Sequence, residues 1–182
     1  MSQVPREVIW VVCAVLTEAA VIDGLKLKVP NWLTFHFAAL GLIYCGYQGG
    51  SAGLVWSLEG AALGLALLLP LYAIGGMGAG DVKLLAGVGA WVGPALTLQA
   101  FVATALVGGV MALAMVAWSG RWVHHWAMFQ TIGGEIMGVR SPGKLSEIAA
   151  ARKPTMLLLP YGIPMAVGTV GWFFWSGLLA AG

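Results

Sequence analysis

The stretch YAIGGMGAGDVKLLAGVGAW, residues 72–91, places one carboxylate, Asp81, between a cluster of glycines and an apolar run. The chain around it is strongly hydrophobic: 60% of its 182 residues are apolar and only 9% are charged. Since a soluble domain usually carries about 25% charged residues, we interpret the chain as an integral membrane protein. A carboxylate within a bilayer is costly unless it is paired, hydrated or protonated. Asp81 therefore needs a structural or functional reason.

Hydropathy divides the chain into six apolar stretches, each a candidate transmembrane helix. They cover approximately residues 7–22, 32–48, 53–74, 83–95, 97–118 and 156–177. We predict an all-α, polytopic membrane protein, a bundle of about six transmembrane helices that forms a single domain over residues 1–182. The fourth stretch is short, and Gly93-Pro94 separates it from the fifth. The connection at about 119–155 is expected to lie at the cytoplasmic side or along the membrane interface, because tryptophans alternate there with charges.

The basic residues provide a separate indication of orientation. Six spans place the loops 23–31, 75–82 and 119–155 on one side of the membrane. Eight of the nine Lys and Arg residues lie in these loops or, for Lys83, at a helix mouth beside them, which leaves Arg6 alone on the other side. Since cytoplasmic loops are enriched in Lys and Arg, we predict that these three loops face the cytoplasm.

Two aspartates gather at this predicted cytoplasmic side. Asp23 ends the first span and Asp81 opens the fourth, so the two helices run in opposite directions and their acids lie at similar depth. Two facing carboxylates in a partly dry site share one proton, and such a pair can activate a water molecule for peptide hydrolysis. Two simpler roles stay open. Asp81 would cap its helix, and Asp23 would pair with Lys26 in the headgroup layer.

The glycines before Asp81 are expected to form an unwound segment, since glycine tolerates positive φ and close backbone approach. Such a segment can hold an extended substrate strand. Other glycines at four-residue spacing, Gly60 with Gly64 and Gly89 with Gly93, predict close helix packing instead.

The remaining polar residues suggest little chemistry. Glu18 and Glu59 are expected to face the bundle interior. Cys13 and Cys45 lack a CxxC partner and are interpreted as small apolar residues. His124 and His125 are adjacent, which separates them by about 100° on a helix, and they have no third ligand nearby. The sequence therefore predicts no metal site and no cofactor.

Three motifs resemble one family. Gly78-Ala79-Gly80-Asp81-Val82-Lys83-Leu84 resembles the GxGD signature of type IV prepilin peptidases, which are intramembrane aspartyl proteases. Asp23 with the following KVPNWLT, residues 28–34, is similar to the family's other catalytic aspartate and its Pro-Asn element. PYGIPMAVG, residues 160–168, is similar to the Pro-aromatic-Gly segment of the family's last helices.

The resemblance implies that Asp23 and Asp81 are the catalytic pair, supported by Gly78, Gly80 and Lys83. Lys83 would either tune the Asp81 carboxylate or reach to lipid phosphates. The implied substrate is a prepilin-like precursor with an N-terminal leader before a hydrophobic helix, cut at the cytoplasmic face of a bacterial inner membrane. Membrane lipids are the other expected partner, and no nucleic acid is expected. The chain resembles a compact form without the CxxC-bearing cytoplasmic domain, so N-methylation is left undecided, as are the substrate-binding residues and the oligomeric state.

Two other functions compete with the peptidase. A small proton-coupled transporter or channel subunit would use Glu18, Glu59 and the aspartates as a proton path. A non-catalytic assembly scaffold would need Asp81 only as a helix cap.

Overall fold

The structure is a computed structural model that describes residues 4–73, 76–119, 130 and 160–179. This part of the chain contains the helices α1 (Arg6–Lys26), α2 (Asn31–Ala73), α3 (Ala79–Ser119) and α6 (Gly162–Trp175). No strand occurs within these ranges, so the predicted all-α fold is confirmed for them. The predicted connection at 119–155, with its two histidines, lies outside the described residues except for Ser119 and Gln130.

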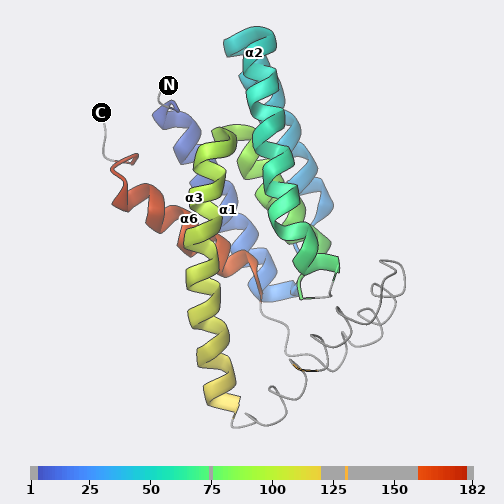
Figure 1. The fold of residues 1–182 in the computed structure, drawn as a ribbon, viewed down its shortest axis with the longest axis vertical. Coiled ribbons are helices and arrows are strands. Elements are labelled where there is room, and N and C mark those ends of the chain that lie inside the picture. The colour runs from blue at the N-terminus through green and yellow to red at the C-terminus, as the bar shows by residue number, and fades with distance from the viewer. Residues whose placement is uncertain (1–3, 74–75, 120–129, 131–159, 180–182) are drawn as a thin grey trace.

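Two of the helices are broken at a glycine. α2 has 43 residues and α3 has 41, and at 1.5 Å per residue a straight helix of that size would be about 60 Å long, twice the thickness of a bilayer core. Gly50 in α2 has φ 58° and Gly93 in α3 has φ 71°, values that L side chains rarely adopt. Figure 1 shows both elements doubling back. Each is therefore a pair of arms, 31–49 with 51–73 and 79–92 with 94–119.

The helices have the length and composition of a membrane protein. Within the described ranges, α1, α2 and α3 are long and apolar enough to cross a bilayer, while α6 is apolar but has only 14 residues. The six predicted spans correspond in sequence to α1, the four arms and α6. That all six cross the membrane stays a prediction.

The first arm of α3 forms the centre of the bundle. Every residue from Leu84 to Gly93 is buried, as expected for a helix that is apolar on all sides. Glycines permit this packing: a Cβ on Gly64 would lie 2.6 Å from the Leu85 carbonyl oxygen, and Gly60 and Gly89 approach each other even more closely. The predicted small-residue packing of these helices is confirmed.

Hydrogen bonds to backbone oxygens fix α2 against this central arm. Trp91 Nε1 donates to the carbonyl oxygen of Phe37 at 2.8 Å, and the Trp91 ring stacks on the Phe37 ring. Ser57 Oγ donates to the Ala90 oxygen at 2.5 Å. The two arms of α2 are thus both attached to the helix that begins near Asp81.

α6 closes the bundle by packing against both α1 and α3. Figure 1 shows it running obliquely across them, with its end toward the same end of the bundle as the start of α1. Gly168 permits the contact with α3, since a Cβ there would lie 2.6 Å from the Thr104 backbone. The start of α6 is thereby brought to the end of α1.

The expectation that Glu18 and Glu59 face the bundle interior is wrong. Both side chains are exposed on the surface of the chain. The reason is helical periodicity: α1 buries the stripe that contains Val12, Leu16, Ala19 and Asp23, and Glu18 lies about 100° from Ala19 around the axis.

Candidate active site

Asp81 lies in the first turn of α3 and is buried, with 6% of its surface exposed. Its Oδ2 accepts a hydrogen bond from the Gly78 amide at 3.1 Å. Because α3 begins at Ala79, this is an acid in the first turn that reaches back to the amide at the helix cap, where the helix dipole also favours a negative charge. The capping role considered from the sequence is therefore real, and it orients the carboxylate.

The GxGD glycines act through close approach rather than through unusual dihedral angles. Residues 76–78 lie outside the helices, as expected for an unwound segment, but Gly76, Gly78 and Gly80 are not among the residues with positive φ. A Cβ on Gly80 would lie 2.8 Å from the carbonyl oxygen of Val29 and 3.0 Å from its Cβ. Gly80 thus allows the residue before Asp81 to contact the connection that follows α1.

Asp23 lies in the last turn of α1 and has only 3% of its surface exposed. Its Oδ2 accepts a hydrogen bond from the Gly162 amide at 2.8 Å. A Cβ on Gly162 would lie 3.0 Å from both Cβ and Oδ2 of Asp23. Lys26, the partner considered from the sequence, is exposed on the same turn. The hydrogen bond seen at the Asp23 carboxylate comes from the start of α6.

The start of α6 adjoins both aspartates. Gly162 bonds Asp23, and the preceding residue, Tyr161, lies within electrostatic reach of Asp81. The contact between Gly80 and Val29 joins the start of α3 to the connection that follows α1. The structure therefore brings the end of α1, the start of α3 and the start of α6 together at one end of the bundle.

Lys83 has partners that the sequence did not suggest. Its Nζ donates to Asn31 Oδ1 at 3.0 Å and lies 4.7 Å from the centre of the Phe35 ring. Asn31 is the first residue of α2. Lys83 thus joins the starts of α2 and α3.

Sequence reasoning missed Asn31, Tyr161 and Gly162 as members of this site. Each lies inside a segment that was singled out for its resemblance, the Pro-Asn element or the Pro-aromatic-Gly segment. What could not be read from either segment was the partner of each residue, because Gly162 meets Asp23 across 139 positions of the chain.

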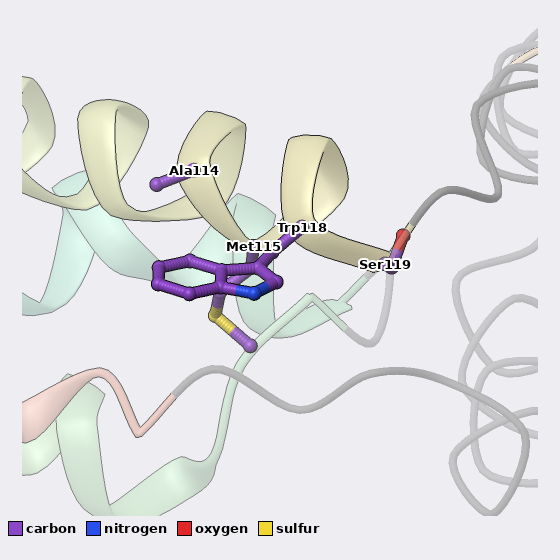
Figure 2. A pocket seen from close by; sticks show the side chains of 4 residues that line it. All are labelled: Ala114, Met115, Trp118 and Ser119. Carbon is purple, nitrogen blue, oxygen red and sulfur yellow. The ribbon is translucent and has the colours of Figure 1, made fainter.

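The site offers little for a metal ion. Among the described residues, no three His, Cys, Asp or Glu side chains gather in a way that could hold one. The surface hollow of about 440 Å³ shown in Figure 2 is lined by Ala114, Met115, Trp118 and Ser119 at the end of α3. None of these is an acid, so the hollow is not the carboxylate site.

Comparison with known proteins is decisive at the level of the family. The model of the type IV leader peptidase family matches residues 10–113, more than half of the chain. The chain belongs to this family. The match contains both Asp23 and Asp81, as well as the Asn31 and Lys83 pair.

A relative from Neisseria gonorrhoeae is described as "Prepilin leader peptidase/N-methyltransferase". Its sequence is 35% identical to that of this chain over 119 residues. The aligned part is 61% of this chain and 41% of the relative. The chain therefore matches less than half the length of that relative. No solved structure was found to match the chain.

Proposed function

We propose that this protein is an intramembrane aspartyl endopeptidase, with Asp23 and Asp81 as its catalytic residues. One observation carries the proposal: two buried acids from different helices lie at the same end of the bundle, and the segments that bear them contact each other through Gly80 and Val29. Buried carboxylates are costly and are found mainly at functional sites. Membership of the leader peptidase family supports a peptidase.

The chemistry follows from a pair of acids that shares one proton. Mutual repulsion and burial keep one carboxyl protonated while the other is charged. The charged carboxylate removes a proton from a water molecule, which attacks the scissile carbonyl, and the protonated partner transfers its proton to the carbonyl oxygen, giving a tetrahedral diol. Collapse of the tetrahedral diol breaks the C–N bond as a proton passes to the leaving nitrogen. The acid that took the proton from water gives it to the leaving nitrogen, and a hydroxyl of the diol returns a proton to the other acid, so the pair again shares one proton.

The proposed substrate is a prepilin-like precursor with a leader followed by a hydrophobic helix. This rests on the family and on the printed name of the relative. The basic loops support cleavage at the cytoplasmic face of a bacterial inner membrane, because the aspartates lie at the ends of spans that lead into those loops.

The two competing functions account for less of the structure. A proton path needs acids along an interior route, and Glu18 and Glu59 are exposed. A scaffold explains the capping contact of Asp81, but it does not explain why Asp23 is buried against the start of α6.

The test is cleavage of a prepilin-like peptide by the purified protein in detergent or liposomes. Asp23→Asn and Asp81→Asn should each lower kcat on the order of 10³-fold, within the range for loss of a general acid or base, while circular dichroism shows an unchanged helical fold. The exposed acids are matched controls: Glu18→Gln and Glu59→Gln should cleave as fast as the wild type. Near-normal turnover in either aspartate variant would reject the pair.

A further inference from the structure

The short connection between α1 and α2 links the two aspartates physically. It leaves α1 through Leu27, a left-handed residue with φ 51° whose amide donates to the Asp23 carbonyl oxygen at 2.7 Å. Two residues later, the buried Val29 places its carbonyl oxygen against Gly80. The left-handed conformation of Leu27 is uncommon for a non-glycine residue and persists only where the surrounding structure holds it. The path from Asp23 to Asp81 is thus short and conformationally defined.

A side-chain pair lies next to this contact. Asn31, the first residue of α2, accepts a hydrogen bond from Lys83, which stands two residues after Asp81. Phe35, one turn further along α2, lies beneath the Lys83 ammonium group, and residues four apart share a helix face. The ammonium is therefore held by a neutral amide and an aromatic ring, and both belong to the segment that follows Asp23.

We propose that Asn31 and Lys83 are positioning residues that hold the start of α3, and with it Asp81, in register with the end of α1. The inference rests on the proposed function and adds to it a role for two residues that do not touch the reacting atoms. A displacement of about 1 Å in a catalytic group can cost 10²-fold in rate. A contact that fixes two acid-bearing segments therefore acts on kcat.

An electrostatic role for Lys83 predicts a different result. If its charge tuned the aspartates, removing that charge would disfavour their ionised form and move the acidic limb of the pH–rate profile to higher pH. Replacing the neutral Asn31 would then leave the profile and the rate unchanged. The positioning role predicts that the two substitutions have the same effect, because each removes the same hydrogen bond.

The experiment is a double-mutant cycle on peptide cleavage. Asn31→Ala and Lys83→Met should each lower kcat roughly 10-fold, as a shift of a few tenths of an ångström would, with KM and the shape of the pH profile unchanged. The double variant should be no slower than the slower single variant, since both substitutions remove one shared interaction. Asn31→Asp keeps the accepting oxygen and should retain kcat within about twofold.

Lys26→Met is the control for loss of positive charge, because Lys26 is an exposed lysine of the same end of the bundle. It should leave kcat unchanged. The proposal would be overturned if the kcat of the double variant fell by the product of the two single losses. So would an acidic limb that moves in Lys83→Met while Asn31→Ala stays fully active.

Failure of the proposed function gives a separate result. If the wild-type protein cleaves no prepilin-like peptide, the peptidase proposal fails, and the pair is judged by thermal unfolding in detergent. Each single variant should then lower Tm by a few degrees, and the double variant by no more than the larger single loss. Fully additive shifts would show that the two side chains are not coupled.

Discussion

Replacing Gly162 by alanine tests whether the Asp23 carboxylate must be where the structure places it. The new Cβ would lie 3.0 Å from both Cβ and Oδ2 of Asp23 and 3.3 Å from its Cγ. Each contact is shorter than ordinary van der Waals contact by a few tenths of an ångström, so the carboxylate must move by about that much. The 2.8 Å hydrogen bond from the Gly162 amide is lengthened or lost.

The expected effect on activity follows from these numbers. A hydrogen bond to a charged group contributes about 1.5–3 kcal/mol, and a misplacement of 1 Å costs about 10²-fold in rate. We therefore expect kcat/KM for a prepilin-like peptide to fall roughly 10- to 100-fold in Gly162→Ala. Gly162 is not a residue with positive φ, so alanine fits its backbone and the loss comes from the contact with Asp23.

Gly171 on the same helix provides the matched control. Nothing lies within 4 Å of a Cβ at that position, and alanine is a better helix former than glycine by about 1 kcal/mol. Gly171→Ala should therefore cleave normally and unfold at the same or a higher temperature. The reasoning is refuted if Gly162→Ala is as active as Gly171→Ala.

Three further outcomes are expected. Gly60→Ala should lower Tm, since its Cβ would collide with the Gly89 backbone and overpacking costs about 1–3 kcal/mol; unfolding in detergent measures this, and an unchanged Tm would contradict the packing. Trp91→Phe should destabilise by roughly 1 kcal/mol, because the buried bond to the Phe37 oxygen is lost, and the same unfolding assay would show no change if that bond were unimportant. Cleavage should depend on pH as a bell, because both aspartates are protonated at low pH and both are ionised at high pH; a rate that rises steadily across the range would exclude a shared proton.

Local features of the sequence account for most of the helices. A helix satisfies the backbone N–H and C=O groups of a long apolar run within the bilayer. Gly93-Pro94 marks one of the two places where the chain reverses between two arms. The four-residue spacing of Gly60 and Gly64 also predicts close helix packing, since it places both glycines on one helix face. These are properties of neighbouring residues, and they can be read without knowing the fold.

The contacts that build the site depend on distant parts of the chain and could not be read in the same way. Gly162 and Lys83 stand in recognisable segments, but their partners, Asp23 and Asn31, are determined by how α6 and α2 pack. The orientation of Glu18 was misjudged for a related reason. An acid in an apolar stretch suggests a buried role, whereas the stripe that a helix buries is set by its neighbours.

Asp23 and Asp81 have almost no exposed surface, so the proposed catalytic pair is covered by its own helices and is not open to other helices of the membrane. If the pair is catalytic as proposed, a substrate must displace part of this covering before it reaches the carboxyl groups. The need for that displacement would then limit cleavage of other membrane proteins, even if the chemistry itself had little preference for one amide over another.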